Sequence, residues 1–136
     1  MSVAFTNAGM AWAFSMIGKR IGRGECTDLV QLHLAYSGAR PADFSNYRNY
    51  IWGAIPNGAR PGDVIQFEFC KFRWTSGNSW GEIYMDHHTA IIVAINSNGL
   101  QLLHQNAPIG GPVKLETLNL NWKTQGTYRF WRPVKW

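Results

Sequence analysis

Two cysteines differ in their potential for covalent chemistry. Cys26 follows a glycine-rich stretch and opens a helical pattern, with Lys19, Arg20 and Arg23 just upstream. A helix N-terminus and nearby cations both stabilise a thiolate, so we expect the pKa of this thiol to lie below its ordinary value of ~8.5. That environment favours a nucleophile, although position alone leaves a buried structural role open. Cys70 lies within an alternating strand pattern, which is typical of a structural cysteine.

A cysteine nucleophile needs a base, and the sequence offers four histidines. His33 lies inside the helical pattern that Cys26 opens, which indicates packing. His87 and His88 begin a strand, so their side chains should point to opposite faces. His104 follows on the return strand of the same hairpin. His104 or Asn106 can therefore approach His88 across neighbouring strands if the register places them on one face.

A zinc site is the alternative use of these side chains. Cys26, Asp86, His87, His88 and His104 are all possible ligands. Neighbouring histidines on a strand cannot easily face one ion, and the sequence contains neither CxxC nor HExxH. We therefore expect no metal and no cofactor.

The elements that would position these residues fall into helices first and strands afterwards. Apolar periodicity predicts helices over 4–17 and from Cys26 to about Tyr36, and then a long loop over 39–61. Alternation predicts strands over 63–72, 88–95, 100–106, 112–118 and 127–134, with a hairpin turn near Ser97 and Asn98. In the first of these strands Cys70 should share a face with Val64. The fold class is α+β, with N-terminal helices packed on a C-terminal antiparallel sheet of four to six strands.

Composition limits the class of protein. The 136 residues fit a single domain over 1–136, and 46% hydrophobic and 14% aromatic residues can supply its core. The net charge is +5, and the basic residues are scattered along the sequence. This distribution disfavours binding to nucleic acid and suits anionic surroundings such as a cell-wall polymer. No apolar run reaches the length of a membrane span, and the N-terminus lacks signal-peptide features. We expect a monomer, either cytoplasmic or released without a recognisable signal peptide.

Aromatic residues stand in the segment 73–86, which we interpret as a long connection. Trp74, Trp80 and Tyr84 could form the wall of a substrate groove there.

Four segments, in order, resemble the CHAP and NlpC-type branch of papain-like cysteine amidases and peptidases. They are GKRIGRGECTDLV (18–30), RPGDVIQF (60–67), HHTAIIVAI (87–95) and LLHQN (102–106). The motifs GECTDLV, HTAIIV and LLHQN are also similar to the cysteine-proteinase-like domain of fungal cortical actin-patch proteins and its bacterial relatives. The resemblance covers about residues 10–133.

The resemblance implies a papain-like fold and a role for each matching residue. Cys26 is then the nucleophile, His88 the general base and His104 the group that orients His88. Gln105 and Asn106 would support this arrangement. The backbone N–H of Cys26 would donate to the oxyanion.

The leading hypothesis is therefore hydrolysis of an amide bond through a thioester, on a peptide or a peptidoglycan stem peptide. A catalytically silent binding module on the same fold is the first alternative. It is motivated by Glu25, where many relatives have Gln or Asp, and by Arg20, where papain-like peptidases usually supply Gln. Arg20 is accordingly a candidate for the substrate groove. A thiol acyltransferase or deamidase is the second alternative.

Overall fold

The computed structural model describes residues 3–47, 49–107 and 110–136. Two helices precede five strands, which confirms the α+β class. The elements are α1 (Val3–Ser15), α2 (Cys26–Tyr36), β1 (Val64–Ser76), β2 (Ser79–Asn96), β3 (Gly99–His104), β4 (Lys114–Leu118), a 3-10 turn (Leu120–Trp122) and β5 (Lys123–Trp131). No helix in the described ranges is long and apolar enough to cross a membrane.

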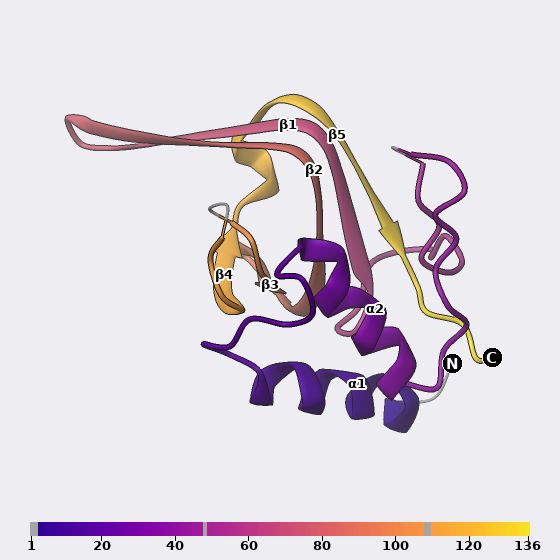
Figure 1. Cartoon of the computed structure of the whole chain (residues 1–136). Helices are drawn as coiled ribbons and strands as arrows, with labels where there is room; N and C mark the ends of the chain where they lie inside the picture. Colours follow the sequence, from indigo (N-terminus) through magenta and orange to yellow (C-terminus); the bar gives the residue numbers. More distant parts are fainter. Residues whose placement is uncertain (1–2, 48, 108–109) are drawn as a thin grey trace.

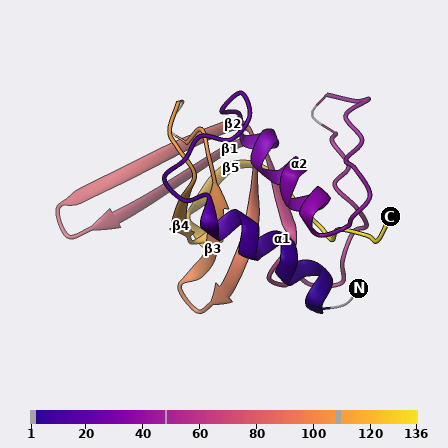
Figure 2. The same cartoon turned by 60° about the horizontal axis from the view of Figure 1, so that its bottom comes forward.

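The strands form one antiparallel sheet in the order β4-β3-β2-β1-β5. Figures 1 and 2 show α1 and α2 together on one side of this sheet, with a hairpin of β1 and β2 projecting beyond it. Leu29, Val30 and Leu34 of α2 pack against Val64 of β1 and Ile91 of β2. Burial of this apolar stripe fixes where the start of α2 meets the sheet.

The hairpin arm replaces the connection expected over residues 73–86. That expectation was wrong, because β1 and β2 stay paired as far as Ser76 and Ser79. Gly77 adopts a φ of +60° at the tip, which allows the tight turn. On the arm, the Arg73 guanidinium lies 4.2 Å from the centroid of a Trp80 ring. Cross-strand pairs of this kind stabilise a two-stranded hairpin.

A β-bulge in β1 reverses the alternation of its side chains. Phe69 has a φ of +54°, and the register with β5 shifts between Glu68 and Lys71. As a result Cys70 packs in the cluster that contains Ile65, whereas Val64 packs on the helix side. The prediction that Cys70 and Val64 share a face was wrong, because one extra residue changes strand parity. Cys70 is fully buried, and its thiol donates to the carbonyl of Thr127 at 3.0 Å.

The β2–β3 hairpin sets the register of the histidines. Its strands pair from Asn96 and Gly99, so the turn lies at the expected residues 97–98. Ile91 lies opposite Leu103. This register brings His88 and His104 to the same face of neighbouring strands.

Candidate active site

The N-terminus of α2 carries the proposed nucleophile. Cys26 is the first residue of the helix, and it is buried apart from 8% of its surface. The loop before it is held by Gln105, whose amide group is fully buried. The Gln105 oxygen accepts from the Ile21 N–H at 2.9 Å, and its nitrogen donates to the carbonyls of Ile21 at 2.9 Å and Glu25 at 2.6 Å. Gln105 thus supports the position of Cys26, a role on the nucleophile side of the site.

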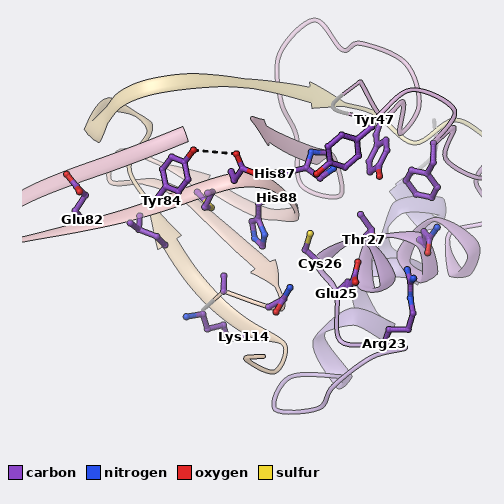
Figure 3. Close-up of a pocket in the computed structure, with 18 residues that line it drawn as sticks. Arg23, Glu25, Cys26, Thr27, Tyr47, Glu82, Tyr84, His87, His88 and Lys114 are labelled. Carbon is purple, nitrogen blue, oxygen red and sulfur yellow. Dashed lines mark hydrogen bonds between the residues drawn. The ribbon is translucent and has the colours of Figure 1, made fainter. Parts of the chain in front are cut away.

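His88 faces this nucleophile from β2. Figure 3 shows the Cys26 sulfur and the His88 ring turned toward one another in a shared cleft. The thiol also lies within hydrogen-bonding reach of the backbone of Thr89, the residue after His88. His88 is buried and packs its ring beside Phe67, at 6.1 Å between centroids. Helix α2 and strand β2 therefore bring together the two residues assigned to the reaction.

A chain of hydrogen bonds fixes the tautomer of His88. The carboxylate of Glu116 lies 3.0 Å from His104 Nε2, and His104 Nδ1 lies 2.9 Å from His88 Nε2. Hydrogen bonding to His104 holds the pKa of Glu116 below its ordinary value, so Glu116 is ionised and accepts. His104 Nε2 then carries the proton and Nδ1 accepts from His88 Nε2–H. The remaining nitrogen of His88, Nδ1, keeps its lone pair and can accept a proton.

Sequence reasoning found His104 and missed Glu116. Lys114 also contacts Glu116, at 3.3 Å, so the last carboxylate of the chain is itself paired. Glu116 reaches the site because β4 pairs with β3, with Leu102 opposite Glu116. The alternation over 112–118 predicted a strand, but no local signal gives its register. Glu116 could therefore not be identified as part of the site from the sequence alone.

Burial, and not the helix or nearby cations, dominates the charge state of Cys26. Burial raises the pKa of the Cys26 thiol, and the Glu25 carboxylate raises it further. Backbone hydrogen bonds from Thr89 and Thr27 act in the opposite direction but are smaller. The expected lowering of the pKa was wrong, because desolvation disfavours the thiolate more strongly than these dipoles favour it.

Two of the three cations expected to activate Cys26 have other partners. Arg23 pairs with Asp28 at 3.3 Å, and Arg20 donates to the carbonyl of Gly110 at 2.5 Å.

Burial also lowers the pKa of His88 to about 3, with the neighbouring His104 acting in the same direction. The resting site is consequently a neutral thiol beside a neutral imidazole. Such a pair requires His88 to remove the proton as the sulfur attacks.

His87 occupies the opposite face of β2, as strand alternation predicts. It pairs with Glu68 of β1, whereas His88 pairs with Phe67. Both oxygens of Glu68 approach His87 Nδ1, at 2.5 and 2.7 Å. The Tyr47 and Tyr50 rings pack against the His87 ring, at 4.6 and 4.8 Å between centroids. His87 is thus anchored on a different network from that of His88.

The zinc alternative finds no support in this arrangement. Across residues 3–47, 49–107 and 110–136, no group of three or more His, Cys, Asp or Glu side chains gathers as metal ligands would. The hydrogen bonds described above instead use both nitrogens of His104.

A cleft of about 1150 Å³ opens at Cys26 and His88. Tyr84 lines it, as expected for a groove residue, and so does Asn106. Trp74, Trp80 and Arg20 are not among the described residues that line it. The two tryptophans lie on the hairpin arm, where Trp80 lies beside Arg73 near the tip and the Trp74 ring packs on Trp122 at 5.4 Å between centroids. Arg20 instead donates to the carbonyl of Gly110.

Asn106 stabilises its own loop. Its side-chain oxygen accepts from the backbone N–H of Gly110 at 2.6 Å, and its φ is +66°. His104 is oriented instead by Glu116.

The far wall of the cleft is aromatic and was not predicted. It comprises Phe44, Tyr47 and Tyr50, from a loop whose sequence has no periodicity to mark these residues.

Comparison with known families gives the fold a name. The family model of the AIM3/BBC1 cysteine proteinase-fold domain matches residues 2–136. The chain belongs to this family. Its fold is therefore a cysteine proteinase fold, as the resemblance implied, while membership of the CHAP or NlpC branch stays a proposal. No solved structure matches the chain.

A curated fungal protein is similar to this member of the family. Altered inheritance of mitochondria protein 3 of Debaryomyces hansenii is 25% identical over 141 residues. The aligned region covers 91% of the chain and 15% of that relative, so the chain spans less than a fifth of the relative's length.

Proposed function

We propose that the domain is a cysteine-dependent amide hydrolase that acts through a thioester. The observation that carries this proposal is the Cys26 thiol turned toward His88, whose ring is hydrogen-bonded to His104, which in turn bonds to Glu116. A binding module has no need of a buried thiol beside a base of fixed tautomer. The cysteine proteinase fold of the family supports the same reading.

The reaction starts from the neutral pair. His88 Nδ1 takes the thiol proton as Cys26 Sγ bonds to the carbonyl carbon of the amide. The carbonyl oxygen becomes an oxyanion, and the backbone N–H groups at the start of α2 can donate to it. Glu116 stabilises the imidazolium that forms, through His104.

Collapse of this intermediate breaks the C–N bond. His88 gives its proton to the departing amine, and the acyl group remains on Cys26 as a thioester. The oxygen of a water molecule then attacks the thioester, while His88 takes a proton from that water. The carboxylic acid leaves, and the proton returns to the thiol. An acceptor amine in place of water would make the same site an acyltransferase.

The competing proposal is a silent binding module with the same cleft. The raised pKa of Cys26 and the carboxylate of Glu25 beside it favour this alternative. An ionised Glu25 cannot donate to an oxyanion. The two proposals differ in whether Cys26 accepts an acyl group.

Acyl transfer from p-nitrophenyl acetate tests the proposal. We expect a burst of p-nitrophenolate equal to the amount of protein, with the acetyl group located on Cys26 by mass spectrometry. Cys26→Ala and His88→Ala should remove the burst, and Cys70→Ala should keep it, since Cys70 is buried away from the cleft. If the parent shows no more reaction than Cys26→Ala, the domain is a binding module. Release in heavy-oxygen water, with and without glycinamide, then separates hydrolysis from transfer.

A further inference from the structure

A carboxylate stands directly beside the proposed nucleophile. Glu25 is the N-cap residue of α2, in a capping box with Asp28, and it precedes Cys26 in the chain. Glu25 is exposed and lines the cleft together with Cys26, and Figure 3 shows the two residues next to each other. Neighbouring Cα atoms lie ~3.8 Å apart. A group that binds to Glu25 therefore lies close to the bond that Cys26 attacks.

The cations that line the cleft do not neutralise Glu25. Arg23 pairs with Asp28 at 3.3 Å, and Lys114 pairs with Glu116 at 3.3 Å. In the part of the chain that the structure describes, no lysine, arginine or histidine lies within ion-pair distance of Glu25. The Glu25 carboxylate is consequently available to a cation that enters the cleft.

The far wall of the cleft suits a cation as well. It comprises the rings of Phe44, Tyr47 and Tyr50, and the faces of aromatic rings attract ammonium and guanidinium groups. Burial raises the pKa of the Tyr50 hydroxyl, and neighbouring acidic groups, Glu25 among them, raise it further. The Glu25 carboxylate and the Tyr50 ring thus act on the same part of the cleft.

We propose that Glu25 selects substrates that carry a cationic group, an ammonium or a guanidinium, within one residue of the scissile amide. The inference rests on the proposed function and names the substrate class of that site. A Lys or Arg side chain and a free N-terminus both have this chemistry. The cation pairs with Glu25 on one side and meets the aromatic wall on the other. The net charge of +5 describes the whole chain, whereas the residue next to the nucleophile is acidic.

Pairing with a cation also prepares the thiol for reaction. Burial raises the pKa of Cys26, and the Glu25 carboxylate raises it further. A cation that pairs with Glu25 offsets the second effect, because a nearby positive charge favours the thiolate. Neutral and anionic substrates leave the thiol at its higher pKa. The carboxylate that disfavours the resting thiolate therefore makes the reaction depend on a cationic substrate.

Three chloromethyl ketones that alkylate Cys26 test this selectivity in the Cys70→Ala background. Acetyl-lysine chloromethyl ketone carries a cationic side chain, acetyl-norleucine chloromethyl ketone is its neutral counterpart, and norleucine chloromethyl ketone carries a free amino group. Each rate is divided by the rate with N-acetylcysteine, which corrects for intrinsic reactivity. We expect at least one cationic reagent to label Cys26 about fivefold faster than the neutral reagent at low salt, and less so at high salt. The faster of the two identifies the source of the cation.

Glu25→Gln should bring the ratio of cationic to neutral labelling close to one. The ratio is insensitive to the resting thiol pKa, because both reagents meet the same thiol. Glu82→Gln is the matched control and should keep the ratio, since Glu82 lines the same cleft from β2 but pairs with Lys71 at 4.0 Å. A ratio near one in the parent, an unchanged ratio in Glu25→Gln, or an equal loss in both variants would overturn the inference.

Iodoacetamide separates the two levels of the argument, because it is neutral and reports on Cys26 without using Glu25 as a binding group. If His88→Ala leaves iodoacetamide labelling of Cys26 unchanged, the proposed function fails. If that labelling depends on His88 but the cationic reagents have no advantage over the neutral one, the selectivity inference alone is overturned.

Discussion

Acidification should unfold this protein partly through one histidine. Burial lowers the pKa of His88 from 6.5 to about 3 in the folded state. The unfolded chain binds this proton below pH 6.5, whereas the folded chain does not bind it until much lower pH. His88 therefore contributes stability above its unfolded pKa, and this contribution is lost as the pH falls toward about 3.

The size of the effect follows from the two pKa values. At about pH 4.5 the pH lies about two units below the unfolded pKa and still above the folded one. At 1.36 kcal/mol per unit, the folded state should lose about 3 kcal/mol relative to neutral pH through His88 alone. That is a large share of the ~5–15 kcal/mol that stabilises a typical domain.

Urea unfolding of the parent and of His88→Gln measures this contribution of His88 to the free energy of unfolding. The free energy of unfolding would be determined for each at about pH 7 and about pH 4.5. His33 is also buried with a lowered pKa, but it is present in both proteins and cancels in the comparison. We expect the acid-induced loss to be about 3 kcal/mol smaller in the variant. Equal losses in the two proteins would refute the claim that His88 is buried and neutral.

Four substitutions give further predictions. Glu25→Gln removes a carboxylate that raises the pKa of Cys26. The thiol should therefore titrate at lower pH when its ionisation is followed by ultraviolet absorbance. An unchanged titration would contradict this. Gln105→Ala leaves the loop before α2 without two buried hydrogen bonds and one part-buried hydrogen bond. The substitution should cost about 3 kcal/mol in urea unfolding, and a cost below about 1 kcal/mol would be too small for that role. Glu116 raises the pKa of His88 and Lys114 lowers it. Glu116→Gln should therefore slow iodoacetamide labelling of Cys26, and Lys114→Gln should speed it. Changes of the same sign in the two variants would argue against a role for Glu116 acting through His104.

Local patterns were sufficient for the elements that carry the main residues. Helix α2 was predictable because its apolar stripe, its glycine-rich approach and Gly38 are all local signals. The β2–β3 hairpin was predictable because its turn residues and branched strands adjoin in sequence. Together they place Cys26, His88 and His104.

Long-range features were not available from local patterns. Glu116 depends on the register of β4 against β3, which no nearby residue specifies. The aromatic wall of the cleft comes from an irregular loop. The parity error at Cys70 arose from a single bulge at Phe69, a non-glycine residue at positive φ. The sign of the Cys26 pKa shift needed the burial of the folded state, because helix and charge effects alone point the other way.

The most direct test of the account compares two neighbouring histidines. Cys26 labelling by iodoacetamide would be followed near neutral pH in the Cys70→Ala background, with His88→Ala and His87→Ala as the matched pair. In the proposed mechanism His88 is the base, whereas His87 lies on the other face of β2 and pairs with Glu68. The account predicts that His88→Ala slows labelling at least about tenfold, as loss of a general base does, while His87→Ala stays within about twofold of the parent. Slow labelling in His87→Ala with normal labelling in His88→Ala would contradict the assignment of the catalytic base.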